Sequence, residues 1–141
     1  MRIAVIDGQG GGMGKAIVEK LRAEFGDTIN IIALGTNALA AALMLKAGAD
    51  EGASGENAIA YCSPKVDAIL GPIGIIAANS MLGELTPLMA RAIAESPAKK
   101  VLIPLNRCNI YMAGIKGEPL PNYIEDAVGQ IRSMVKADKN A

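Results

Sequence analysis

The segment RIAVIDGQGGGMGKAIVEKL, residues 2–21, joins an apolar run to an amphipathic run through a loop that consists mostly of glycine. An uninterrupted apolar run is typical of a central parallel strand that is covered on both faces. Beyond the glycines, Ile17 and Leu21 stand four residues apart among charged neighbours, as the buried face of a helix requires. The segment therefore predicts a strand over 2–7, a glycine loop and a helix over about 12–25.

The same order of apolar runs and helical patterns continues along the chain. Further strands are expected over 28–35, within 51–64, over 66–71 and over 99–105. Further helices are expected from a cap at Thr36 or Asn37 to about Ala47, from Ser54, in a broken helical region over 73–96, and from Pro121 to about Lys136. This alternation predicts an α/β fold, a three-layer Rossmann-like domain with a mostly parallel sheet of five or six strands.

The end of the chain decides between five strands and six. Residues 110–115, IYMAGI, have the pattern of another strand, and only residues 106–109 separate them from the strand at 99–105. Four residues cannot carry a parallel crossover, so we expect this last strand to be antiparallel. We assign residues 1–136 to a single Rossmann-like nucleotide-binding domain and residues 137–141 to a frayed tail.

Small and polar residues gather where the predicted strands end. In a doubly wound sheet the strand order reverses between the first strand and the strand at 66–71, and a crevice opens at their carboxyl ends. We expect this crevice to bind a ligand. The residues that we assign to a cofactor-binding site are Gly8, Gln9, Gly10, Gly11, Gly12, Met13, Gly14, Thr36, Asn37, Gly71, Pro72, Ile73, Asn106 and Cys108.

The glycine loop suits a small phosphorylated ligand. A helix N-terminus presents unpaired N–H groups and a partial positive charge, and glycines let a phosphate approach without a Cβ in the way. Gly8, Gly12 and Gly14 form a GxxxGxG spacing. A P-loop is disfavoured because Gln9 replaces the first glycine of GxxxxGK[ST] and Ala16 replaces its Ser or Thr.

Two known families share features of this loop. Residues 5–21, VIDGQGGGMGKAIVEKL, resemble the opening of short-chain dehydrogenases, and GQGGGMG resembles the loop of dihydrodipicolinate reductases. Both resemblances imply NAD or NADP as the cofactor. One element of such a site is missing, since LGTN, residues 34–37, has no Asp or Glu to accept the ribose hydroxyls. Thr36 and Asn37 can donate there to a ribose or to a 2′-phosphate.

Asp7 stands between the first strand and the glycines. A carboxylate about 6 Å from a phosphate charge disfavours binding by roughly 3 kcal/mol at an effective dielectric constant of about 20. Two or three charge-assisted N–H bonds to the phosphate, each contributing about 1.5 to 3 kcal/mol, outweigh this repulsion. We interpret Asp7 as an acceptor of N–H bonds that holds the loop in shape; the alternative is a ligand to a ribose hydroxyl or a cation.

The sequence does not identify catalytic residues. The chain has no histidine, the commonest general base near neutral pH, and its two cysteines are too few for a metal site. Tyr61 and Lys65 match the YxxxK pair of short-chain dehydrogenases, but Pro64 disfavours a helix through both, so we interpret the match as accidental. Cys108 is either a nucleophile or, as is commoner for a small thiol, a buried residue.

Composition limits the partners. Fourteen basic and fourteen acidic residues cancel, which predicts no attraction to nucleic acid or to an anionic membrane. No secretory signal follows Met1 and no apolar stretch is long enough to span a bilayer, so we expect a cytoplasmic protein without a membrane partner. Residues 38–48 are apolar nearly all round the expected helix, and we expect a homodimer or a larger homo-oligomer to bury them.

Over nearly its whole length the chain resembles a family of short bacterial proteins catalogued as a domain of unknown function, through residues 3–21, 33–59, 71–87 and 103–110. The resemblance implies a Rossmann-like fold and a cytoplasmic location, and it implies no activity. Three hypotheses remain. The first is a small nucleotide-binding protein for NAD, NADP or a related adenine dinucleotide, acting as a sensor or partner subunit. The second is a small oxidoreductase-like enzyme completed across a homodimer, and the third is an assembly protein without a ligand.

Overall fold

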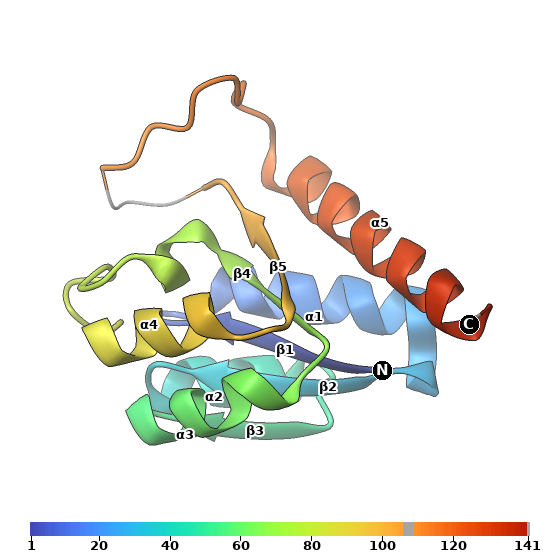
Figure 1. The fold of residues 1–141 in the computed structure, drawn as a ribbon, viewed down its shortest axis with the longest axis horizontal. Coiled ribbons are helices and arrows are strands. Elements are labelled where there is room, and N and C mark those ends of the chain that lie inside the picture. Colours follow the sequence, from blue (N-terminus) through green and yellow to red (C-terminus); the bar gives the residue numbers. More distant parts are fainter. Residues whose placement is uncertain (106–108, 141) are drawn as a thin grey trace.

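A computed structural model describes residues 1–105 and 109–140 and shows one parallel sheet between two layers of helices (Figure 1). The five strands lie in the order β3-β2-β1-β4-β5. Their bounds are β1 Arg2–Asp7, β2 Asn30–Gly35, β3 Glu51–Ser54, β4 Ala68–Pro72 and β5 Lys99–Ile103. The α-helices are α1 Gly12–Phe25, α2 Ala38–Lys46, α3 Glu56–Cys62, α4 Pro87–Glu95 and α5 Leu120–Lys139, with short 3-10 turns at Gly26–Thr28, Ser63–Lys65 and Ile73–Ile76. The predicted three-layer Rossmann-like fold is confirmed.

The middle of the sheet is β1, which pairs in parallel with β2 along its whole length and with β4 on its other side. Because β1 is covered on both faces, its residues from Ile3 to Ile6 are fully buried. The strand order reverses between β1 and β4, as expected of a doubly wound sheet. This reversal places the loops after β1 and β4 on either side of one crevice.

Each face of the sheet has its own core. On one face, α1 and α5 pack over β1, β4 and β5, and their buried apolar side chains include Ile17, Leu21, Val128 and Ile131. On the other face, α3 and α4 cover the sheet with Ile59, Met89 and Ile93 among others. The helix α2 lies beside α1 and contributes Met44 to the first core. Both faces are therefore filled, and the edge where strands end is left for binding.

The predicted antiparallel sixth strand is wrong. Residues 109–119 form an irregular arm that stands outside the sheet and leads to α5 (Figure 1). The N–H of Ile115 donates to the carbonyl of Met112, and Gly114 between them has a φ of +85°. This reverse turn takes up the last four residues of the run 110–115, so the segment does not form a ladder with β5. Every strand pair of the described sheet is parallel.

The predicted helices differ from the structure mainly at their ends. The helix α5 continues to Lys139 and so includes three residues of the predicted frayed tail. The helix α3 begins at Glu56 with Gly55 as its N-cap, and not at Ser54. In the broken region, α4 begins as predicted, since Thr86 accepts a hydrogen bond from Met89 N and Pro87 occupies the first turn.

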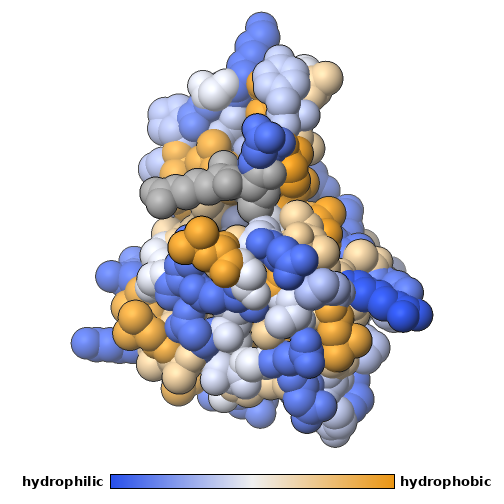
Figure 2. All heavy atoms as spheres, turned by 90° about the vertical axis from the view of Figure 1, so that its left-hand side faces the viewer, coloured by the Kyte–Doolittle hydropathy of each residue, from blue (hydrophilic) through white to orange (hydrophobic). Residues whose placement is uncertain are grey.

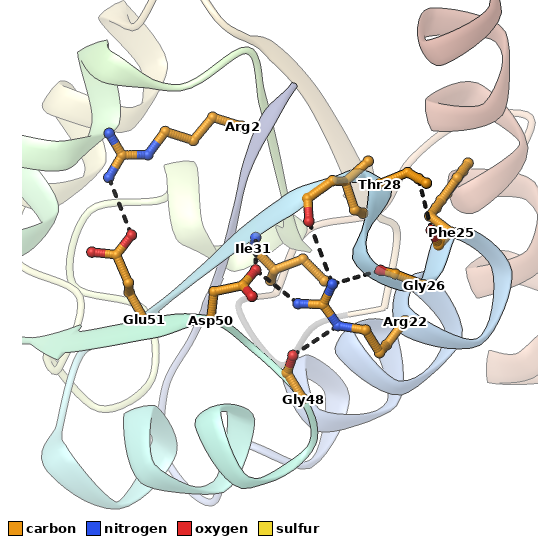
Figure 3. A network of polar contacts seen from close by, with 10 residues as sticks. Arg2, Arg22, Phe25, Gly26, Thr28, Ile31, Gly48, Asp50 and Glu51 are labelled. Atoms are coloured by element: carbon orange, nitrogen blue, oxygen red, sulfur yellow. Dashed lines mark hydrogen bonds and ion pairs between the residues drawn. The ribbon is translucent and has the colours of Figure 1, made fainter.

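At the amino edge of the sheet, Arg22 joins three segments (Figure 3). From α1 its guanidinium donates to the carbonyl of Gly48 at 2.9 Å, to the carbonyl of Gly26 at 2.6 Å and to the Asp50 carboxylate at 2.8 Å. Asp50 also accepts from Ile31 N at 2.8 Å, at the start of β2. One side chain therefore ties the end of α1 to the α2–β3 connection and to β2, at the opposite edge from the glycine loop.

We expect Arg22→Met to lower the free energy of unfolding by about 2 to 3 kcal/mol, because the side chain keeps its apolar stem while two carbonyls and Asp50 lose their donor. Urea unfolding measures this change. The matched control is Arg91→Met, which removes an exposed ion pair with Glu95 and should change stability by less than about 0.5 kcal/mol. Equal stabilities of the two variants would contradict the structural role of Arg22.

Candidate functional site

A cavity of about 810 Å³ opens at the carboxyl edge of the sheet, where the strand order reverses. Apolar and polar side chains are interspersed over the face of the molecule that contains this edge (Figure 2). The cavity is bordered on one side by the loop after β1 and on the other by the loop after β4. Its described lining residues are Asp7, Gly8, Gln9, Gly10, Gly11, Gly12, Met13, Pro72, Gly74, Met81, Leu82 and Leu105.

The glycines of the loop fall into two groups. Gly11 is the N-cap of α1 with a φ of +75°, and a Cβ there would lie 2.9 Å from the Cα of Ala40. A Cβ at Gly14 would collide with the sulfur of Met44 in α2. By contrast, a Cβ at Gly10 or Gly12 would meet no atom within 4 Å. Gly11 and Gly14 therefore let α1 pack closely against α2, whereas Gly10 and Gly12 leave open space beside the cavity.

Asp7 holds the glycine loop in place through hydrogen bonds at both of its ends. Its carboxylate accepts hydrogen bonds from Gly8 N at 2.8 Å and from Gly14 N, in the first turn of α1, at 2.7 Å. The side chain is only 5% exposed. Burial raises the pKa of Asp7, the bonds from Gly14 and Gly8 lower it in part, and the charge of Glu84 raises it further. The interpretation of Asp7 as a brace for the loop is confirmed.

Several N–H groups of the loop remain available to a ligand. Gly11 N donates to Gly8 O at 2.9 Å, and Asp7 takes the N–H of Gly14. Within the described part of the chain, no acceptor is found for the N–H groups of Gly12 and Met13. These two groups lie at the N-terminus of α1 and belong to residues that line the cavity.

At the end of β2, Thr36 and Asn37 are joined by Glu84, a residue that was not predicted to belong to the site. The carboxylate oxygen Oε1 of Glu84 accepts from Thr36 Oγ1 at 2.7 Å, from Asn37 Nδ2 at 2.7 Å and from Gln9 N at 2.9 Å. Asn37 also caps α2 by accepting from Ala40 N, as predicted. No spacing pattern links Glu84 to β2, because more than forty residues separate them in the chain.

The segment that contributes Glu84 has an unusual backbone. Between the turn at Ile73–Ile76 and α4, three non-glycine residues have left-handed conformations: Asn79 at φ 66°, Met81 at φ 58° and Leu82 at φ 57°. The N–H of Asn79 donates to Leu85 O at 2.8 Å and closes the segment into a compact loop. Strained backbone conformations of this kind persist only where many surrounding contacts hold them in place. In this loop, the left-handed conformations belong to residues that include Met81 and Leu82, both of which line the cavity.

The other predicted site residues are distributed unevenly. Pro72 lines the cavity, whereas Gly71 is buried in β4, where a Cβ would collide with the carbonyl oxygen of Ile6. Ile73 begins the 3-10 turn and is not among the lining residues. Thr36 and Asn37 are not among the lining residues, but Asn37 Nδ2 donates to the carbonyl of Gln9, which is one of them. Asn106 and Cys108 lie outside the described residues.

The YxxxK pair does not reach this site. Tyr61 is at the end of α3, which starts at the carboxyl edge after β3 and runs back to the amino edge, and Lys65 is in the next 3-10 turn. The ammonium group of Lys65 lies over the ring of Tyr61, 2.9 Å from its centroid. The pair is thus at the far end of the sheet from the glycine loop, as expected of an accidental match.

The described lining of the cavity can bind and orient a ligand. It offers backbone N–H groups, the side-chain amide of Gln9 and apolar side chains, while both oxygens of Asp7 are already engaged. Among residues 1–105 and 109–140 there is no group of three or more Cys, Asp or Glu side chains that could hold a metal ion. Hydrogen bonding to the backbone is therefore the main polar interaction that these residues offer.

The chain belongs to the family of the domain of unknown function DUF3842, whose model matches residues 2–136. No curated protein and no solved structure matches it. Among the described helices, none has the length and apolarity needed to cross a membrane.

Asp7→Ala leaves the buried N–H groups of Gly8 and Gly14 without acceptors, so we expect it to lower the free energy of unfolding by about 2 to 4 kcal/mol. Asp7→Asn keeps one acceptor, so its fold should persist with a smaller loss. Urea unfolding of both variants measures the difference. Equal losses for the two would contradict the brace.

The pH dependence has a defined sign. Because the folded-state pKa of Asp7 is raised, its contribution to stability is fully present below pH 3.8 and is lost as the pH rises through that folded-state pKa. Asp7→Asn lacks this titration. The stability difference between the wild type and this variant should therefore narrow as the pH rises above about 4.

Proposed function

We propose that this member of the DUF3842 family is a cytoplasmic nucleotide-binding protein that holds NAD, NADP or a related adenine dinucleotide with its pyrophosphate on the glycine loop, and that acts as a sensor or partner subunit. The observation that carries the proposal is the open first turn of α1. There, Gly12 and Met13 have N–H groups without acceptors among the described residues, and Gly10 and Gly12 leave the approach to them unobstructed.

The position and size of the cavity support a dinucleotide. Ligands of open α/β sheets bind at the carboxyl edge where the strand order reverses, and the cavity lies at this point between β1 and β4. Its volume of about 810 Å³ is within the usual range for small-molecule and cofactor sites. The N-terminus of α1 then supplies both N–H donors and the positive end of the helix dipole to a phosphate.

The charge of Asp7 opposes an anionic ligand but does not prevent its binding. At about 6 Å the repulsion amounts to roughly 3 kcal/mol, whereas two N–H bonds to a phosphate contribute about 3 to 6 kcal/mol together. The geometry of the brace keeps both Asp7 oxygens on Gly8 and Gly14 and away from the ligand.

A role as sensor or partner subunit agrees with the described lining, whose one carboxylate, Asp7, is occupied by the brace. The alternative is an oxidoreductase-like enzyme with a site completed across a homodimer by Asn106, Cys108 and Asn109. Exposed apolar side chains favour an assembled state: Leu39 and Leu45 on α2 are 68% and 44% exposed, and Tyr111 on the arm is 87% exposed. We therefore include a homo-oligomer in the proposal.

Gly12→Val should abolish dinucleotide binding while the protein remains folded. A Cβ at this position meets no atom within 4 Å in the fold, and we expect the valine side chain to occupy the space in front of the α1 N-terminus. Thermal shift and calorimetry with NAD, NADP, ATP and inorganic pyrophosphate measure the effect, and saturation at about one hundred times Kd should stabilise the wild type by about 2.7 kcal/mol.

The matched control for this experiment is Gly129→Val, a helical glycine of α5 whose added Cβ would make only an ordinary contact with Arg132 at 3.5 Å. It should retain full binding. If no compound shifts the unfolding of the wild type, the nucleotide-binding proposal is overturned in favour of an assembly protein without a ligand.

The oligomeric state tests the second part of the proposal. We expect light scattering at micromolar concentration to show a dimer or a larger assembly, and Leu39→Glu to shift it toward the monomer by placing a charge in the buried α2 interface. Leu88→Glu on α4, where the native leucine is 50% exposed, is the control and should leave the assembly intact. A monomeric wild type would contradict the homo-oligomer.

A further inference from the structure

The proposed dinucleotide site needs an acceptor for the ribose hydroxyls, and Glu84 is placed to supply it. In dinucleotide-binding sheets, a carboxylate at the end of the second strand accepts the two ribose hydroxyls next to the pyrophosphate. The end of β2 in this chain provides Thr36 and Asn37 instead. Both of these side chains donate to a carboxylate that comes from the loop after β4.

We propose that Glu84 is the acceptor for the vicinal ribose hydroxyls of the ligand, and that the ligand is consequently a dinucleotide without a 2′-phosphate, of the NAD class. This inference rests on the proposed function and adds to it the specificity-determining residue. It also explains why LGTN needs no acidic residue of its own.

The two oxygens of Glu84 have different surroundings. Oε1 accepts all three hydrogen bonds, from Gln9 N, Thr36 Oγ1 and Asn37 Nδ2, at 2.7 to 2.9 Å. From residues 1–105 and 109–140, Oε2 accepts none. A carboxylate oxygen has two lone pairs and accepts from hydroxyls readily. Oε1 therefore fixes the side chain in place, and Oε2 has no donor among the described residues.

Glu84 is adjacent to the pyrophosphate loop. Its Oε1 lies 3.3 Å from the position of a Cβ at Gly8, and it takes the N–H of Gln9; both of these residues line the cavity. A ribose follows the pyrophosphate directly along a dinucleotide. The carboxylate is thus placed where the neighbouring ribose of a ligand bound at the glycine loop would lie.

The charge of Glu84 favours hydroxyls over phosphate. Burial raises its pKa, but the hydrogen bonds from Gln9, Thr36 and Asn37 lower it by more, so the side chain remains ionised at neutral pH. All three donors are neutral groups, and no salt bridge to Glu84 occurs in the described part of the chain. A 2′-phosphate would meet an ionised carboxylate there without a cation between them.

The loop keeps Glu84 in position before a ligand arrives. On one side of it are the left-handed residues Met81 and Leu82, and on the other Thr86 Oγ1 donates to the Glu56 carboxylate at 2.6 Å. Ser80 Oγ donates to Gly74 O at 2.5 Å and ties the loop to the 3-10 turn. A side chain held in this way loses little conformational entropy on binding.

Glu84→Gln tests this role with little change in shape. The amide oxygen can still accept from Gln9, Thr36 and Asn37, but the amide nitrogen that replaces Oε2 donates hydrogen bonds and cannot accept them. The wild type should bind NAD at least about a hundred-fold more tightly than NADP. In Glu84→Gln, NAD affinity should fall about ten- to one-hundred-fold, while NADP affinity should stay constant or rise.

Calorimetric titration of the full chain with NAD and with NADP measures these affinities. Glu95→Gln is the matched control, since it changes an exposed carboxylate that pairs with Arg91 at the far end of α4 and should leave the NAD to NADP ratio unchanged. Thermal unfolding of Glu84→Gln without ligand shows whether the loop contacts persist.

The outcomes separate the two proposals. If the wild type binds neither dinucleotide, the proposed function is overturned and the role of Glu84 with it. If NAD binds but Glu84→Gln leaves its preference over NADP unchanged, only the role of Glu84 is overturned. A variant that binds both dinucleotides more tightly than the wild type also overturns it, because Glu84 would then obstruct the ribose position.

Discussion

The arrangement of this edge of the protein depends on the two hydrogen bonds that Asp7 accepts from Gly8 and Gly14. They connect the end of the central strand to the first turn of α1, so the loop between them has little freedom. Because the N–H of Gly14 donates to Asp7, the helix N-terminus leaves the preceding N–H groups, of Gly12 and Met13, beside the cavity. A buried carboxylate close to a proposed phosphate site is consistent with function for this reason, because it orders the donors that outweigh its own repulsion.

Glu84 makes a second connection, between the loop after β4, the end of β2 and the glycine loop. Asp7 and Glu84 are used in different ways. Both oxygens of Asp7 are consumed inside the protein, whereas Glu84 has one oxygen fixed and the other without a described donor. The proposed site thus combines backbone donors for a pyrophosphate with one carboxylate oxygen, Glu84 Oε2, as the acceptor for a ribose. At the opposite edge, Arg22 holds the segments that support β2 without any part in this site.

The glycines show how far sequence spacing can be used. The GxxxGxG spacing selects Gly8, Gly12 and Gly14, but in the fold Gly11 and Gly14 are required by close packing against α2, while Gly10 and Gly12 are the ones with open space. Spacing identifies a loop that needs glycine; it does not distinguish a glycine that admits a neighbouring helix from one that admits a ligand. That distinction depends on where α2 lies.

The sequence by itself determined the order of strands and helices, because this order follows from local periodicity. It favoured the role of Asp7 as a brace, because the groups involved are a few residues apart, and it led us to expect the reversal beside β1 from the usual winding of such sheets. Only the tertiary structure decided the place of Glu84, since its partners Gln9 and Thr36 are brought to it by the sheet. It also decided against a sixth strand, because a turn at Gly114 interrupts a run whose composition alone suits a strand. Hydrogen bonds between distant segments leave no spacing pattern in a single sequence.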